Sequence, residues 1–187
     1  MESRGAWSGS DVIFEAAETL SRADEHWMRA ALAAAVEAGV NGEVPIGAAL
    51  INADGEILAL AGNRTRTDCD PTGHAEIIAL RLAAQATGNF RLTGTTMYAT
   101  IEPCAMCAGA LIQARISRLV YGAPDERAGA IQSVFRICDE TALNHRIAIT
   151  GGVLADECRL LMQQFFQARR VSKVENRKTE GESAVLP

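Results

Sequence analysis

The 187-residue sequence contains no apolar run close to the roughly 20 residues that cross a bilayer, so we expect no membrane span. Residues 1–22 lack the charged-then-apolar layout of a secretory leader, and their acidic residues argue against an organelle transit peptide. Positive charge is not in excess either. The formal net charge is −5, whereas a general nucleic-acid binder usually presents a basic face. The lack of a membrane span, of a secretory leader and of a transit peptide predicts a cytoplasmic protein.

The sequence also lacks the even number of cysteines that a complete set of disulfides would need, because it has five. Cys104 and Cys107 form a C-x-x-C pair, which in a reducing compartment favours a metal site over a disulfide. We expect the other cysteines to be free thiols; they are Cys69, Cys138 and Cys158.

No internal repeat is present, and the hydrophobic fraction of 48% suits a single domain with one sizeable core. Strand patterns alternate with helical patterns, which predicts a layered α/β domain over residues 24–172. Residues 1–23 are interpreted as a flexible extension and 173–187 as a polar, disordered tail. The expected strands span residues 46–51, 57–61, 95–101, 119–121 and 147–149, and the expected helices span 24–39, 74–88, 104–114 and 155–172.

Three local signals refine these elements. Asp24 is a good N-cap and predicts the start of the first helix. Residues 52–55, with the sequence Asn-Ala-Asp-Gly, predict a hairpin between the first two strands. Pro103 suits the first turn of the helix over 104–114.

The residues that carry chemistry are His74, Glu76, Cys104 and Cys107. One His and two Cys are one ligand short of a closed tetrahedral zinc shell, so such a site keeps a position for water. Zinc lowers the pKa of that water, and a nearby carboxylate can move its protons. This arrangement matches the H-x-E…P-C-x-x-C pattern of zinc-dependent deaminases.

Helix geometry supports a shared site. Cys104 and Cys107 project from nearly the same face of the first turn, where the helix dipole favours thiolates. His74 opens a different helix, so the metal would bridge two helix starts at one end of the sheet. Glu76 lies about 200° further round its helix and would point toward the substrate side.

Two other interpretations of the motif use fewer of its residues. A structural zinc knuckle needs a fourth ligand, for which Cys69 is the nearest candidate, and it leaves Glu76 without a role. A redox C-x-x-C leaves both His74 and Glu76 unexplained.

From about Asp24 to Arg170 the chain resembles the bacterial tRNA-specific adenosine deaminases, within the cytidine-deaminase-like fold. The stretches that carry the resemblance are Val44–Ala48, Gly62–Arg64, Asp70–Thr72, His74–Glu76, Glu102–Ala110, Asn144–Arg146, Leu154–Cys158 and Gln164–Phe166.

This resemblance implies a three-layer α/β/α fold with a central mixed sheet of about five strands. It implies a homodimer with one zinc per subunit, held by His74, Cys104 and Cys107. The implied reaction is hydrolytic conversion of the wobble adenosine of an arginine tRNA to inosine. Zinc-activated water would attack the adenine ring, with Glu76 as the proton shuttle.

The resemblance also implies contacts to the anticodon loop. Asn63 would contact the target nucleoside through its amide, although the same residue is also a common turn former. Phe166 and Arg169, with Phe165 beside them, would meet the splayed loop by stacking and phosphate contact. Packing of Phe165 or Phe166 in the core, and a simply solvated basic helix end, are the alternatives.

His145 and Arg146 are further candidates for RNA contact or for bracing their own loop. Two departures from the family pattern bear on substrate choice. Gly73 replaces the usual Ala before the His, and the loop segment 65–69 is unlike the expected versions. This loop leaves room for a deaminase of a free base or nucleoside, such as guanine, cytosine or a modified purine. A non-catalytic, zinc-stabilised binding module is the third hypothesis, against which the presence of Glu76 argues.

Overall fold

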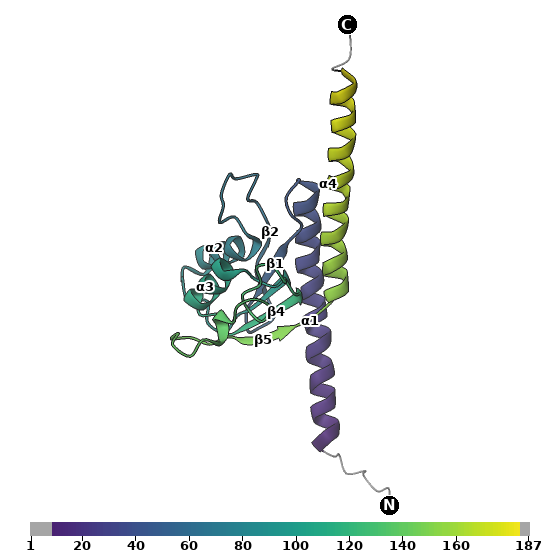
Figure 1. The fold of residues 1–187 in the computed structure, drawn as a ribbon. Coiled ribbons are helices and arrows are strands. Elements are labelled where there is room, and N and C mark those ends of the chain that lie inside the picture. The colour runs from purple at the N-terminus through teal and green to yellow at the C-terminus, as the bar shows by residue number, and fades with distance from the viewer. Residues whose placement is uncertain (1–8, 184–187) are drawn as a thin grey trace, which may run out of the picture.

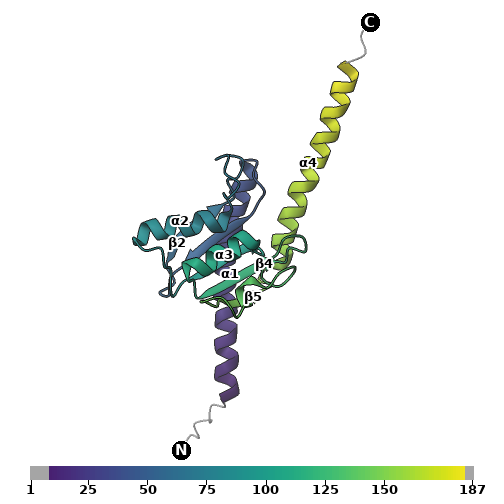
Figure 2. The same cartoon turned by 60° about the vertical axis from the view of Figure 1, so that its left-hand side comes forward.

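A computed structural model describes the backbone of residues 9–183 and the side chains of residues 22–170. The described residues form three layers, with α2 and α3 on one face of a mixed sheet and α1 and α4 on the other (Figures 1 and 2). The predicted α/β/α fold is therefore confirmed. The helices are α1 (Gly9–Val40), α2 (Ala75–Thr87), α3 (Ala105–Ala114), the short 3-10 helix η1 (Ile137–Asp139) and α4 (Ala155–Ser183). The strands are β1 (Gly47–Ile51), β2 (Ile57–Gly62), β3 (Thr96–Ile101), β4 (Arg118–Ala123) and β5 (Ala148–Gly151).

The described strands form one sheet in the order β2-β1-β3-β4-β5. β1 is antiparallel to both β2 and β3, whereas β3, β4 and β5 run parallel. The five predicted strands are thus all present. Because β3 and β4 are parallel, their carboxyl ends meet at the same edge of the sheet, and the C-x-x-C motif follows directly after β3.

Alternation along the strands divides the core into two clusters, one on each face. In β1, Ala48 and Leu50 pack toward α2 and α3, whereas Ala49 and Ile51 pack toward α1 and α4. The central strands are buried on both faces, so they lack the polar alternation of a half-exposed strand.

Asp24 is not the N-cap that the sequence analysis predicted, because α1 begins at Gly9 and runs through this position. Its buried carboxylate accepts hydrogen bonds from the Arg118 guanidinium at 2.7 and 2.6 Å and from the Tyr98 hydroxyl at 2.9 Å. Cap preference reflects local chemistry alone, and here a partner 94 residues away in sequence uses the carboxylate instead.

Other local predictions are partly confirmed. Residues 52–55 do form the β1–β2 turn, in which the Asn52 Oδ1 accepts the backbone N–H groups of Asp54 and Glu56. Pro103 lies before helix α3 rather than in its first turn, because Cys104 is the N-cap. The predicted boundary after residue 23 falls inside α1. Likewise, α4 continues through the boundary after residue 172 as far as Ser183.

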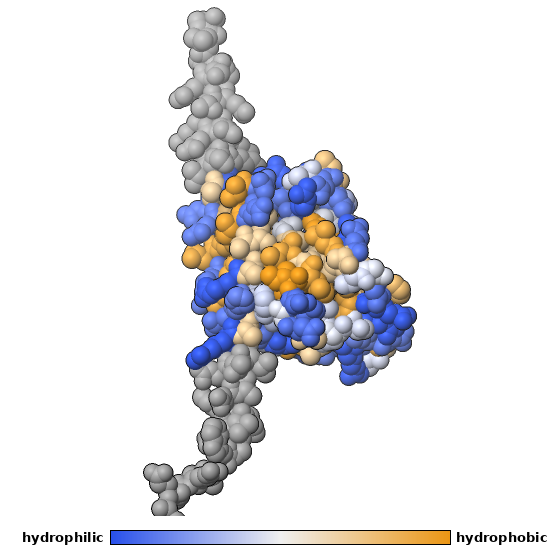
Figure 3. All heavy atoms as spheres, turned by 180° about the vertical axis from the view of Figure 1, so that it is seen from behind, coloured by the Kyte–Doolittle hydropathy of each residue, from blue (hydrophilic) through white to orange (hydrophobic). Residues whose placement is uncertain are grey.

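A hollow of about 400 Å³ lies between α1, β2 and α2. Apolar side chains gather on this face, over the edge strand β2 and its neighbouring helices (Figure 3). Leu60 and Leu82 line the hollow and are each more than two-fifths exposed. Within the described helices, none combines the length and the apolar character that a bilayer crossing requires.

Candidate metal centre and active site

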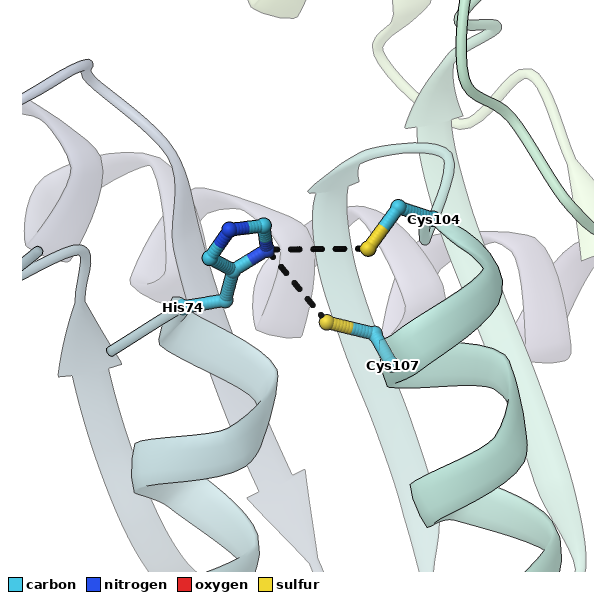
Figure 4. A group of neighbouring side chains, drawn as sticks. All are labelled: His74, Cys104 and Cys107. Atoms are coloured by element: carbon cyan, nitrogen blue, oxygen red, sulfur yellow. Dashed lines mark hydrogen bonds between the residues drawn. The ribbon is translucent and has the colours of Figure 1, made fainter. Parts of the chain in front are cut away.

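His74, Cys104 and Cys107 converge at the edge of the sheet where β3 ends (Figure 4). His74 is the N-cap residue of α2, and Cys104 is the N-cap residue of α3. Cys107 lies one turn into α3 and is fully buried. The predicted meeting of two helix starts is therefore present, and both helix dipoles favour anionic ligands at this point.

The separations of the ligand atoms suit a tetrahedral metal. His74 Nδ1 lies 3.7 Å from Cys104 Sγ and 3.5 Å from Cys107 Sγ. With Zn–N near 2.1 Å and Zn–S near 2.3 Å, tetrahedral angles place the nitrogen and each sulfur about 3.6 Å apart. Both nitrogen–sulfur separations thus fit zinc, and the three donors of the group are one short of a closed shell.

The electrostatics of the site favour a metal-binding thiolate at Cys104, whereas the hydrogen bond with Cys104 and burial raise the pKa of Cys107. Hydrogen bonds, first from Cys107 and then from His74, lower the pKa of Cys104 to about 3. A deprotonated sulfur is the form that binds zinc. Burial works in the opposite direction on Glu76 and raises the pKa of its carboxyl.

Glu76 is 3% exposed, and its Oε2 makes no hydrogen bond to any described residue. Within the described part of the chain, no other buried side-chain oxygen or nitrogen lacks a hydrogen bond. An unpaired buried carboxylate oxygen is costly for folding, so a functional partner is the natural explanation.

A structural zinc knuckle is not supported by the described residues. The metal-ligand group among them comprises His74, Cys104 and Cys107, without Cys69. Cys69 is exposed, and its thiol lies 3.7 Å from the Arg66 carbonyl oxygen that accepts its hydrogen bond. The site therefore stays one protein ligand short of closure.

Two buried carboxylates that the sequence analysis did not assign brace the loops on either side of the site. Glu102 accepts the backbone N–H groups of Ile131, Gln132 and Ser133 at 2.7–3.0 Å, together with the Ser133 hydroxyl. Burial alone would raise the pKa of Glu102, but these hydrogen bonds outweigh it and lower the pKa. The braced loop pairs at Gly129 with Cys104.

The second brace is Glu43, which holds the loop between β2 and α2. No periodicity marks either residue in the sequence. Glu102 has a local signal, because it directly precedes the Pro-Cys pair of the metal motif. Glu43 has no such signal, because its partners lie 22–24 residues further on.

Asn63 lies beside the metal group, and its amide oxygen already accepts a hydrogen bond within the protein. Its Oδ1 accepts the backbone N–H of Ala75 at 2.9 Å and so satisfies one of the free donors at the start of α2. Its amide nitrogen makes no hydrogen bond to a described residue and remains available to a ligand. Gly73 packs tightly against the backbone of Arg64 and Thr65, where an added Cβ would lie 3.3 Å from both.

His145 and Arg146 precede β5, at the amino-terminal ends of the parallel strands, whereas the metal group lies at their carboxyl-terminal ends. The His145 Nε2 donates to the carbonyl oxygen of Ile116 at 2.6 Å, and Ile116 precedes the start of β4. The metal ligands lie beyond the other end of the parallel strands, about 20 Å away for six residues. This hydrogen bond ties the loop of His145 to the residue two positions before β4. Both predicted roles of His145, RNA contact and bracing, stay predictions.

Phe166 and Arg169 lie on α4, which packs against β4, β3 and α1 and then continues away from the domain (Figure 2). Phe166 is 44% exposed, and Phe165 is half-buried with its ring 5.4 Å from that of Phe166. The Arg169 guanidinium stacks on the Phe165 ring at 5.1 Å. The structure thus joins these residues to one another but not to the metal group.

Comparison with known proteins agrees with this geometry. Residues 21–123 match the family described as the cytidine and deoxycytidylate deaminase zinc-binding region. A tRNA-specific adenosine deaminase of Haemophilus influenzae is 46% identical over 159 residues, which cover 85% of this chain and 92% of that protein.

Solved structures show the same similarity. A tRNA:A34 deaminase, studied for A-to-I editing at the wobble position of transfer RNA, is 44% identical with a TM-score of 0.70. The match covers 73% of this chain and 98% of that one. A guanine deaminase of Nitrosomonas europaea, with 24% identity and a TM-score of 0.64 over 75% and 83% of the two chains, shares the fold.

Proposed function

The chain belongs to the zinc-dependent deaminases of the cytidine and deoxycytidylate deaminase family, and we propose that it converts the wobble adenosine of a tRNA to inosine. One observation carries this proposal: an open three-ligand metal group lies beside a buried carboxylate with a free oxygen. The identity of 46% to a tRNA-specific adenosine deaminase supports the substrate. By the same resemblance, an arginine tRNA is the proposed substrate.

The roles of the chain's own residues follow from their positions. His74, Cys104 and Cys107 would hold the zinc. When bound, zinc acts as a Lewis acid that makes a water nucleophilic at neutral pH. Deamination replaces the exocyclic amine of adenine with the oxygen of that water and releases ammonia. Glu76 would accept the two protons of the water in turn and deliver one to the ring nitrogen and the other to the leaving amine, for which its unpaired Oε2 is suited.

The test of this function offers the purified protein an arginine anticodon stem-loop with adenosine at the wobble position. Parallel reactions contain free guanine, cytosine, adenosine and cytidine, and Glu76→Ala serves as the blank. Inosine in the stem-loop alone would support the tRNA enzyme. Ammonia from a free base, with the RNA unchanged, would instead assign the fold to a base deaminase.

The C-terminal helix is the proposed platform for RNA outside the reacting nucleotide. Figure 1 shows α4 rising past the end of the domain that carries the β2–α2 loop. Phe166 on α4 is exposed, and Arg169 on the same helix extends the surface with a cation. His145 and Arg146 lie at the amino-terminal ends of the parallel strands. We propose that His145 braces its loop and that Arg146 contacts RNA away from the reacting nucleotide.

We therefore expect Phe166→Ala to raise KM for the stem-loop about ten-fold with little change in kcat, because stacking on one base contributes roughly 1–3 kcal/mol. Arg169→Ala should raise KM by a smaller factor that shrinks as salt rises. Steady-state kinetics at two salt concentrations measure both effects. Leu160→Ala, on the same helix and 53% exposed, is the control and should keep the wild-type KM. An unchanged KM for Phe166→Ala would contradict the proposal that α4 contacts the RNA.

A homodimer is the proposed assembly, and a tRNA substrate also supports the predicted cytoplasmic location. A second apolar hollow, of about 510 Å³, lies between α2 and α3. Its lining includes Ile77, Leu80 and Met106, and Phe90 stands at its rim with 71% of its surface exposed. Exposed apolar surface of this kind marks an interaction site.

If this surface is the subunit interface, Phe90→Glu should convert the protein from dimer to monomer in sedimentation velocity, because it buries a charge in an apolar contact. Leu60→Glu places the same change on the other hollow and should leave the dimer intact. Dissociation by Leu60→Glu alone would move the interface to the α1–β2–α2 face.

A further inference from the structure

Glu43 occupies the turn between α1 and β1 and is 1% exposed. Its Oε1 accepts the backbone N–H groups of Arg66 and Thr67 at 2.9 and 2.7 Å and the Thr67 hydroxyl at 2.9 Å. Its Oε2 accepts the Thr65 hydroxyl at 3.1 Å and shares the Arg66 N–H at 3.2 Å. One buried carboxylate thus satisfies three consecutive residues of an otherwise exposed loop.

The loop that Glu43 holds is closed on itself. The Arg64 N–H donates to the carbonyl oxygen of Gly73 at 2.9 Å, and the Asp70 N–H donates to that of Thr65 at 3.1 Å. The residues immediately outside this closure are Asn63 and His74. They also approach each other, because the Asn63 Oδ1 accepts the N–H of Ala75.

The ends of the loop therefore belong to the active site, whereas its middle is tied to a different part of the domain. We propose that Glu43 is a positioning residue of the active site: it fixes the loop of residues 64–73 and thereby the placement of His74 and Asn63. It touches neither the metal group nor the substrate and acts through the backbone of the loop. The role of Asn63 rests on the proposed function, whereas the placement of His74 does not.

The charge of Glu43 suits this task. Burial alone would raise its pKa, but the hydrogen bonds from Thr67, Arg66 and Thr65 outweigh burial and lower the pKa. The carboxylate is thus ionised at neutral pH, and charge-assisted hydrogen bonds to it are about twice as strong as neutral ones. Displacements of about 1 Å at a reacting centre cost on the order of 100-fold in rate, so a loosened loop should be visible in kinetics.

The test compares Glu43→Ala and Glu43→Gln with wild type, all fully loaded with zinc. Alanine removes every contact, whereas the glutamine oxygen can still accept the three donors of Oε1. We expect kcat/KM for the stem-loop to fall at least ten-fold in Glu43→Ala and about three-fold in Glu43→Gln. Zinc release to a chelator should be fastest in Glu43→Ala and intermediate in Glu43→Gln. The rate of amide hydrogen exchange over residues 64–73 should rise in both variants.

Asp24→Asn is the matched control for a purely structural role. Asp24 is also a buried carboxylate with several donors, but its partner Arg118 begins β4 at the edge of the sheet opposite the metal group. Asp24→Asn should lower Tm while kcat/KM per bound zinc and zinc release stay at wild-type values. Wild-type kinetics and zinc release in loaded Glu43→Ala would overturn the proposal, as would equal losses in Asp24→Asn.

If Glu43→Ala fails to fold, Glu43→Gln and Thr67→Val, which removes one hydroxyl donor, provide the same comparison. The zinc-release rate separates this proposal from the proposed function. Should the wild type leave the stem-loop unchanged, the assigned substrate is wrong, and release from Glu43→Ala still decides whether the loop holds His74.

Discussion

Replacement of Glu76 by alanine is expected to abolish deamination while the protein keeps its zinc. Glu76 is not a member of the metal-ligand group, so its loss leaves His74, Cys104 and Cys107 in place. General acid–base catalysis contributes typically 10²–10⁴-fold, and here one carboxylate serves several proton transfers. We therefore expect kcat to fall by roughly 1,000-fold or more, measured as inosine formed per bound zinc.

Glu76→Gln sharpens this experiment because it keeps the volume of the side chain and one acceptor oxygen. It should be almost as inactive as Glu76→Ala, since an amide does not carry a proton between water and ring nitrogen. The Tm of both variants should not fall, because the wild-type Oε2 is buried without a hydrogen bond to a described residue. Substantial activity in Glu76→Gln would mean that Glu76 orients a group rather than transfers protons.

The grouping of His74, Cys104 and Cys107 was predictable from the sequence because the spacing that produces it is local. Cys104 and Cys107 are spaced for one helical turn, and His74 with Glu76 shares the start of another. The five strands were also predictable, since buried strands read as short apolar runs between turn residues.

Contacts distant in sequence were not predictable in this way. Asp24 is of a residue type that commonly caps helices, and only the folded sheet brings Arg118 to it. Glu43 and Glu102 are ordinary carboxylates until loops 22–31 residues further along the chain fold over them. His145 was predicted to contact RNA or to brace its loop, but its place at the amino-terminal ends of the parallel strands follows only from strand direction and from its bond to Ile116.

Substitution of either metal-binding cysteine is expected to remove zinc and activity together. A serine hydroxyl is a poor zinc ligand at neutral pH, whereas the low pKa of Cys104 already favours its thiolate. Loss of an outer-shell partner alone costs 10–100-fold in metal affinity, so loss of a direct ligand should cost roughly 100-fold or more. Zinc per chain, measured by mass spectrometry after dialysis against a chelator, should fall to near zero in Cys104→Ser and Cys107→Ser.

The other cysteines provide a matched control for each variant. Cys69 is exposed and Cys138 is buried, and neither belongs to the metal-ligand group. Cys69→Ser controls for the more accessible Cys104, and Cys138→Ser controls for the buried Cys107. Both controls should keep full zinc and activity, although Cys138→Ser should lower Tm because it buries a hydroxyl in the core. A full complement of tightly held zinc in Cys104→Ser or Cys107→Ser would refute the ligand assignment, because two remaining protein ligands would then suffice.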